Sequence, residues 1–215
     1  MTFGQMYLVF QTLWDKAGNP YMPEEQFDEV ANVKLNDYVT DECKKIEAGQ
    51  EHTVRIHALY RPFSKLNSSS IIIPDDIANY RYLLRIKSKY RKECNGVVTY
   101  PEVPVRKAAN NNVDSMQNDP FNKGIDEDPT YTPSFDAGKQ VYTINATTVP
   151  LEISGTYVRT PAKIDSKNNP NTVFELPDFV AEEVIRSIVF RSDIIIENFQ
   201  RAQAEGGEQQ ELKQK

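Results

Sequence analysis

The chain offers few side chains that could bind a metal or perform catalysis. Its only histidines, His52 and His57, match neither the one-turn pair of a helical metal site nor a Cys/His cluster. Its two cysteines, Cys43 and Cys94, are too few and too far apart for a disulfide framework, which favours a reducing compartment. We therefore expect no metal site and no cofactor.

Nucleophilic and phosphate-binding motifs are also missing from the sequence. It contains no glycine-rich phosphate loop and no serine or cysteine in a nucleophile elbow. The carboxylate pair Asp75-Asp76 and the run at 126–128 lie beside prolines in predicted turns, where capping or solvation explains them better than acid–base chemistry. We predict no catalytic residue and conclude that the protein is not an enzyme.

One segment could contact an anionic polymer or a protein partner. Between Tyr80 and Arg91, apolar and basic residues alternate, which predicts a strand with one face on the core and a cationic face outward. The outward candidates are Arg81, Arg85, Lys87, Lys89 and Arg91. Such a row can neutralise phosphates, but solvation or pairing with acids on a neighbour is favoured, because that face lacks aromatic residues for base stacking.

Composition limits the class of protein further. The 215 residues carry a net charge of −6 and a pI of about 5.1, which argues against a general nucleic-acid binder. The sequence has no run of about 18 apolar residues and no N-terminal secretion signal. We expect the protein to have no membrane partner and to stay, or assemble, in the cytoplasm where it is made.

Two helices are predicted near the N-terminus. Thr2 and Gln5 fit a capping box that begins a helix with apolar residues at helical spacing, and this helix ends at 18–20. A second helix begins at Pro23 with two acids and runs toward Gly49. The short link between them predicts an antiparallel helical hairpin.

A long C-terminal helix is predicted from Pro177 to Phe199. Its apolar residues spread beyond the arc of about 100° that a one-sided surface helix needs. Such a helix needs two partners, namely its own core and either a further layer or a neighbouring subunit. Phe190 and Ile194 are therefore candidates for a subunit interface.

Between the helices the sequence predicts a small antiparallel sheet and an arm. Short strands are expected at 71–73, 140–145 and 151–160, and Asn95-Gly96 predicts a tight hairpin turn after the basic strand. Residues 101–138 contain five prolines and few aliphatic residues, which indicates either a disordered linker or an arm ordered by a partner. The aromatic residues in it favour the arm, and the interface candidates are Phe121, Tyr131 and Phe135.

The predicted fold class is α+β. An N-terminal helical hairpin and a long C-terminal helix would pack with a small antiparallel sheet. Residues 1–203 would form a single connector domain with an extended arm at about 101–138. Residues 204–215 have nothing to bury and are expected to be a disordered polar tail.

The order of these elements resembles the head–tail connector, or neck ring, proteins of tailed bacteriophages, most closely the ring proteins of crAss-like phages. The resemblance is carried by the helix with a glycine stop and the Pro-Glu-Glu helix, and by further short segments along most of the chain. These segments are Pro74-Asp75-Asp76, Asn118-Asp119-Pro120-Phe121, Tyr157-Val158-Arg159-Thr160-Pro161 and Glu175-Leu176-Pro177. The family has an aromatic residue soon after Pro-Asp, whereas this chain has Ile77 there and Tyr80 later.

This resemblance implies a structural virion protein. Such proteins form homo-oligomeric rings, commonly dodecamers, in the neck between portal and tail, and they contact the portal protein and other neck or tail rings. DNA passes through the ring without sequence-specific binding. Two other functions remain open from the residues alone: a nucleic-acid-binding module that uses the basic strand at 80–92, and a non-viral scaffold adaptor.

Overall fold

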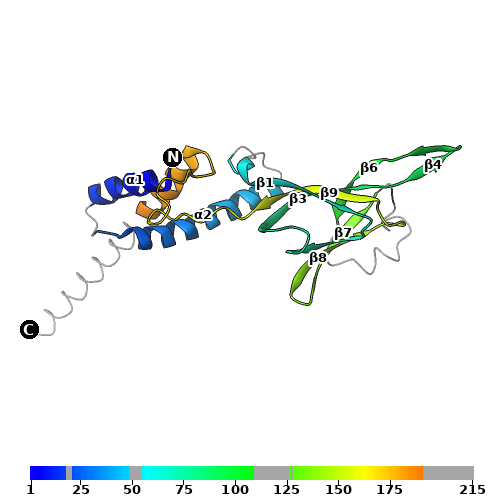
Figure 1. The fold of residues 1–215 in the computed structure, drawn as a ribbon, viewed down its shortest axis with the longest axis horizontal. Coiled ribbons are helices and arrows are strands. Elements are labelled where there is room, and N and C mark those ends of the chain that lie inside the picture. The colour runs from blue at the N-terminus through cyan, green and yellow to red at the C-terminus, as the bar shows by residue number, and fades with distance from the viewer. Residues whose placement is uncertain (18–20, 49–54, 109–125, 127, 191–215) are drawn as a thin grey trace, which may run out of the picture. The chain divides into compact units, whose positions relative to one another are not determined.

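The computed structural model describes all residues except 18–20, 49–54, 109–125, 127 and 191–215 (Figure 1). The chain forms two compact units, where the sequence predicted one domain. The helical unit comprises Met1–Ala58 and Pro161–Lys215, and the sheet unit comprises Leu59–Thr160. The sheet unit is therefore inserted between the two parts of the sequence that build the helical unit.

The helical unit contains the two predicted N-terminal helices, α1 (Phe3–Lys16) and α2 (Glu24–Glu47). The predicted capping box of α1 is confirmed: the Thr2 side chain accepts from the Gln5 amide, and the Gln5 side chain accepts from the Thr2 amide. Pro23 precedes α2, and two acids occupy its first turn, as its sequence predicts. A further helix spans 178–190 among the described residues.

Aromatic side chains join α1 to α2. The Phe27 ring lies 4.8 Å from Phe10 and 5.4 Å from Tyr7, and Phe10 lies 5.0 Å from Trp14. The helix at 178–190 adds a buried row at helical spacing, comprising Val180, Ala181, Val184, Ile185 and Ile188. The core face predicted for this helix is confirmed over these residues.

An irregular segment, 161–177, is fastened to the helices by polar contacts. The buried Asp28 carboxylate accepts from the backbone amide of Ser166 at 2.9 Å and from its hydroxyl at 2.7 Å. Asn32 exchanges hydrogen bonds with the backbone of Ile164. These bonds satisfy polar groups that would otherwise be buried without partners.

The sheet unit holds a seven-stranded sheet in the order β1-β9-β3-β6-β7-β8-β2. It curls almost into a closed barrel, and only the β6–β7 pair is parallel among the strand pairs of the described residues. Its strands are β1 (Tyr60–Leu66), β2 (Ser70–Ile73), β3 (Tyr80–Lys89), β6 (Glu102–Lys107), β7 (Thr130–Asp136), β8 (Lys139–Asn145) and β9 (Glu152–Arg159).

A single apolar cluster fills the inside of this sheet. Its buried members are Ile71, Ile73, Ile77, Leu83, Ile86, Val105, Tyr142, Ile144, Ile153 and Tyr157. Two register shifts in the β3–β9 pairing displace the alternation, so that Leu83 is buried in place of the predicted Leu84. Beyond these shifts Ile86, Ser88 and Tyr90 point inward, as the period of two requires.

A two-stranded hairpin continues β3 and β6 beyond the sheet. Its strands are β4 (Lys92–Cys94) and β5 (Val97–Thr99), joined by the predicted turn at Asn95-Gly96. Both turn residues have positive φ, 51° and 77°, which this dipeptide tolerates best. The hairpin prediction is therefore confirmed.

The predicted fold class was wrong. A helical hairpin and a long helix do not pack on a small antiparallel sheet; instead, a large and nearly closed sheet dominates, and helices occur toward the chain ends. Three strands carry a proline, at Pro62, Pro104 and Pro133. The sequence pattern left the segment around Pro62 undecided between helix and strand, and it placed Pro104 and Pro133 in the arm. Each of these prolines is in register with one neighbouring strand only, where a proline is tolerated because a second row of hydrogen bonds does not need its N–H group.

The predicted arm at 101–138 is regular at both ends. Its first part forms β6 and its last part forms β7, so these parts belong to the sheet. The middle of the arm, with Phe121, lies outside the described residues, as do Ile194 and the tail at 204–215.

Stability should fall above the ordinary tyrosine pKa of 10.0. The hydroxyls of Tyr80 and Tyr142 lie 2.6 Å apart, and burial raises the pKa of each; their contact raises that of Tyr80 further. In the unfolded chain both tyrosines ionise near pH 10. Their contribution to the free energy of unfolding is therefore fully present below that pH. It is lost as the pH rises above it, by up to about 1.4 kcal/mol per pH unit per group.

Unfolding of the chain in denaturant, followed by far-UV circular dichroism between about pH 8 and about pH 11, measures this effect. Above the tyrosine pKa, the free energy of unfolding should decline less steeply with pH for the double variant Tyr80→Phe, Tyr142→Phe than for the parent. Identical pH profiles for variant and parent would contradict the assignment.

Candidate functional site

The cationic residues of β3 lie on the outer face of the sheet. Arg85 and Arg91 are exposed, and Lys87 and Lys89 are half-buried, whereas the residues between them are buried. We call Arg85, Lys87, Lys89 and Arg91 the cationic row. Arg81 is also exposed, but it lies at the first register shift and is separated from the row by the second.

Acidic side chains lie within the same face. Lys87 donates to Glu102 at 3.0 Å, and Lys89 stands directly opposite Glu102 in the β3–β6 register. The hydrogen bond from Lys87 lowers the pKa of the Glu102 carboxyl, and the charges of Lys87 and Lys89 lower it further. Arg91 reaches Glu93 at 3.5 Å. Because the face carries both signs of charge, its geometry fits a protein better than a polyphosphate.

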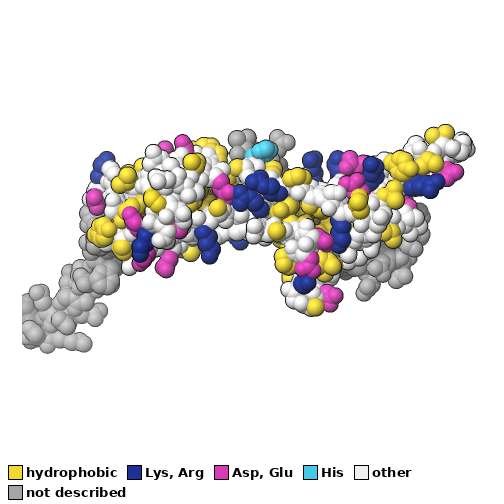
Figure 2. Space-filling model, viewed as in Figure 1, with side chains coloured by type: hydrophobic (Ala, Val, Ile, Leu, Met, Phe, Trp, Pro, Cys, Tyr) yellow, Lys and Arg dark blue, Asp and Glu magenta, His cyan; other side chains and the backbone are white. Residues whose placement is uncertain are grey.

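The hairpin of β4 and β5 exposes apolar residues beyond the sheet. Val97 is 61% exposed and Tyr100 is 56% exposed, and Val98 lies between them. Figure 2 shows hydrophobic side chains gathered beside Lys and Arg on the hairpin that Figure 1 labels at β4. All six strand residues of the hairpin are exposed. A two-stranded hairpin is marginal alone, so these residues are available to a partner.

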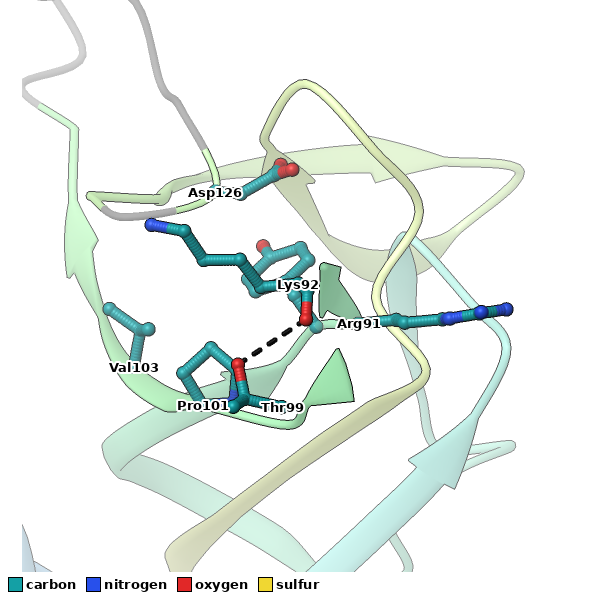
Figure 3. A pocket seen from close by; sticks show the side chains of 7 residues that line it. Arg91, Lys92, Thr99, Pro101, Val103 and Asp126 are labelled. Carbon is teal, nitrogen blue, oxygen red and sulfur yellow. Dashed lines mark hydrogen bonds between the residues drawn. The ribbon is translucent and has the colours of Figure 1, made fainter. Parts of the chain in front are cut away.

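A pocket of about 360 Å³ lies at the base of the hairpin (Figure 3). Its lining residues are Tyr90, Arg91, Lys92, Thr99, Pro101, Val103 and Asp126. Figure 3 shows Lys92 extending across the pocket, whereas Arg91 points away from it. The Thr99 hydroxyl donates to the Lys92 carbonyl at 3.3 Å, which ties the two strands together there.

The pocket contains a tyrosine hydroxyl and a carboxylate among its polar groups. Burial raises the pKa of the Tyr90 hydroxyl, and the nearby Asp126 carboxylate opposes its ionisation further, so Tyr90 stays protonated at neutral pH. Asp126 itself accepts from the amide and hydroxyl of Thr148, at 2.9 and 2.8 Å.

The other predicted interface residues have different environments. Tyr131 packs against the core cluster, with its ring 5.6 Å from Tyr142, so it is engaged within its own sheet. Phe135 in β7 is 80% exposed, and Phe190 near the end of the described helix is 69% exposed. These two remain candidates for contact with a partner.

The carboxylates noted in the sequence have structural partners at each position that the structure describes. Asp76 accepts from the Ile72 amide and from Lys65, and Asp75 accepts from Lys139. Asp128 pairs with Arg106. Within the described parts of the chain, no group of three or more His, Cys, Asp or Glu side chains could hold a metal ion.

Charge is divided unequally between the two units. The sequence of the helical unit contains 12 Lys and Arg against 20 Asp and Glu, and that of the sheet unit contains 13 against 11. The helical unit is thus strongly acidic, and the sheet unit is slightly basic. Surfaces of opposite charge favour association between copies.

Sequence reasoning missed the pocket and the exposed hairpin surface. Asp126 and Lys92 are far apart in the sequence, and only the sheet brings them to one place. The sequence predicted the turn at Asn95-Gly96 but not the exposure of Val97, Val98 and Tyr100, which follow it.

No known protein family matches this chain, and no curated protein sequence is significantly similar to it. No helix among the described residues is long and apolar enough to cross a membrane.

Proposed function

We propose that this protein is a structural subunit of a ring in the neck of a tailed bacteriophage, where the ring joins the portal and head to the tail. It is made in the cytoplasm of the host bacterium and becomes part of the virion. Its partners are further copies of itself, in a twelvefold ring, together with the portal protein and other neck or tail rings. DNA passes through the ring without sequence-specific binding.

The observation that carries this proposal is the exposed apolar hairpin, which follows the cationic row along the chain. The helical unit of the same chain is acidic, so it offers a surface of the opposite charge. A contact between two different surfaces of one chain is heterologous, and such contacts form closed rings when the rotation between subunits permits. The sequence resemblance to neck ring proteins points in the same direction. Phe135 and Phe190 add exposed aromatic area for further contacts.

Shortening the hairpin should prevent assembly while leaving the subunit folded. Lys92 pairs with Thr99, so residues 93–98 can be replaced by a two-residue Asn-Gly turn that joins these positions. The purified full chain should sediment as an oligomer of defined mass, and the shortened chain should sediment mainly as a monomer.

Far-UV circular dichroism serves as the folding control for the sheet unit, and Trp14 fluorescence reports separately on the helical unit. Equal oligomer masses for the full and shortened chains would contradict the role of the hairpin. A full chain that stays monomeric at every concentration and is absent from phage particles would contradict the proposed function.

The cationic row also supports a second candidate, a nucleic-acid-binding module. Its four cations project from one side of β3 at regular intervals. If they neutralise phosphates, affinity for duplex DNA should fall steeply with rising salt, by roughly one power of salt concentration per phosphate contacted. Filter binding across a salt series separates this candidate from the ring subunit.

A further inference from the structure

We infer that the cationic row and hairpin of one copy dock on the exposed stripe of α2 in a second copy of this chain. The inference rests on the proposed function and names the two surfaces that the ring contact would use. The α2 stripe comprises Gln26, Glu29, Val33, Asp37, Asp41 and Lys44, all of them exposed.

The α2 stripe runs straight along the helix. Its residues follow one another at intervals of three or four, which keeps them on one side of a helix with 3.6 residues per turn. The opposite side holds the buried Phe27, Ala31, Leu35 and Val39. Val33 is 59% exposed between the acids Glu29 and Asp37, so the stripe presents an apolar centre with negative flanks.

The hairpin presents the complementary arrangement. Side chains two residues apart share a face of a strand, so Glu93 continues the face of the cationic row, and Val98 stands opposite Glu93 on β5. Tyr100 follows on the same face. The row therefore leads from basic residues to two exposed apolar residues.

The spacing of the two surfaces also agrees. Alternate residues on a strand are about 6.7 Å apart, so the four cations of the row extend over about 20 Å. Positions four apart on a helix are separated by about 6 Å, so the distance from Glu29 to Asp41 is about 18 Å. The two surfaces are therefore of similar length, and cations of the row can reach the carboxylates on either side of Val33.

The ion pairs already present within each surface do not prevent this docking. On the α2 stripe Lys44 pairs with Asp41 at 3.3 Å, and their side chains are 71% and 64% exposed. The side chains of Lys87 and Glu102 are 38% and 48% exposed, and those of Arg91 and Glu93 are 61% and 58% exposed. Pairs at this exposure contribute little in water and exchange partners readily. Glu152 stands opposite Lys89 in the β3–β9 register and so shares this face. The four cations of the row therefore meet three acids, Glu93, Glu102 and Glu152, which leaves a small excess of positive charge toward the α2 stripe.

A second copy explains this surface better than DNA does. A phosphate backbone would have to approach Glu93 and Glu102, and it would leave Val98 and Tyr100 without apolar contacts. The α2 stripe supplies both the carboxylates and the apolar side chain that this face requires. The contact is heterologous, because the two surfaces belong to different units of the chain.

Disulfide trapping between two differently marked chains tests the contact. One chain carries Val33→Cys and the other carries Tyr100→Cys with a tag that changes its mass, both in a Cys94→Ser background because Cys94 is exposed. Under mild oxidation the mixture should give a tagged–untagged dimer on a non-reducing gel. Leu8→Cys, 61% exposed on α1, replaces Val33→Cys as the matched control.

Charge reversal tests the electrostatic part of the contact. Glu29→Lys with Asp37→Lys on the first chain should lower the trapped yield about tenfold, because like charges then face each other. Lys87→Glu with Lys89→Glu on the second chain should restore it. The equally charged control pair Asp15→Lys with Glu182→Lys should leave the yield unchanged. Val98→Cys offers a second trapping position if Tyr100→Cys does not fold.

The inference is wrong if position 33 gives no more tagged–untagged dimer than position 8, or if the reversed charges do not restore the yield. If sedimentation of the same parent chain still shows an oligomer of defined mass, the ring forms through another contact and the proposed function stands. If trapping fails and Lys87→Glu with Lys89→Glu abolishes binding to a duplex DNA probe, the cationic row contacts DNA instead.

Discussion

Replacing Phe27 by alanine is expected to destabilise the helical unit by about 3–5 kcal/mol. The Phe27 ring is fully buried and contacts both Tyr7 and Phe10, so truncation removes the aromatic centre that joins α1 to α2. The surrounding rings are large and cannot close the cavity fully, which adds to the lost transfer free energy.

Trp14 fluorescence can report the destabilisation of the helical unit separately from the sheet unit. It is the only tryptophan in the chain, and its ring lies 5.0 Å from Phe10 in the same aromatic group. Denaturant unfolding followed by Trp14 fluorescence should show a lower midpoint for Phe27→Ala. Val33→Ala, on the exposed side of the same helix, should change the unfolding free energy by less than about 0.5 kcal/mol. Equal midpoints for Phe27→Ala and the parent would contradict the described core.

Replacing Gly155 by alanine is expected to destabilise the sheet unit by about 3 kcal/mol or more. A Cβ atom at this position would lie 2.3 Å from the Arg85 carbonyl oxygen and 2.7 Å from the Phe63 ring. The first contact is with backbone of the neighbouring strand, so relief requires β3 and β9 to separate. The unfolding of the sheet should shift in far-UV circular dichroism, while the Trp14 transition should not.

Gly96→Ala provides the matched comparison. Gly96 has a φ of +77° in the hairpin turn, but nothing lies within 4 Å of an added Cβ. Its cost is therefore backbone strain alone, about 1 kcal/mol. If the two alanine variants proved equally stable, the close approach at Gly155 would be wrong.

Local signals predicted the local structure well. The capping box at Thr2 and the positive-φ turn at Asn95-Gly96 depend on a few neighbouring residues, so the sequence contains all the information that they need. The basic alternation of β3 also predicted correctly that Lys87 and Lys89 point outward. Each of these features would form in much the same way in many different folds.

The size of the sheet could not be predicted, because it depends on which strands pair with each other, and the local sequence does not show this. Pro104 and Pro133 resemble loop residues until the neighbouring strands are known, because a proline is acceptable in a strand when its missing N–H group is not required. The parallel pairing of β6 with β7 joins segments separated by more than 20 residues. The burial of Leu83 depends on register shifts against β9, which alternation within β3 cannot indicate.

The candidate interaction surface was predicted only in part. The cationic residues were identified from their spacing, but Glu102 was not, because it reaches Lys87 only through the β3–β6 register. Tyr131 was expected at an interface, and instead it packs against Tyr142, since its strand belongs to the sheet. Surface composition therefore follows from the fold more than from any single segment.

Electron microscopy of phage particles tests the central claim most directly. Particles from the bacterium that produces this chain would be labelled with a gold-conjugated antibody raised against the purified protein. The ring proposal predicts label at the junction of head and tail on tailed particles. Particles without label at the junction, although the antibody detects the protein in the same lysate, would contradict it.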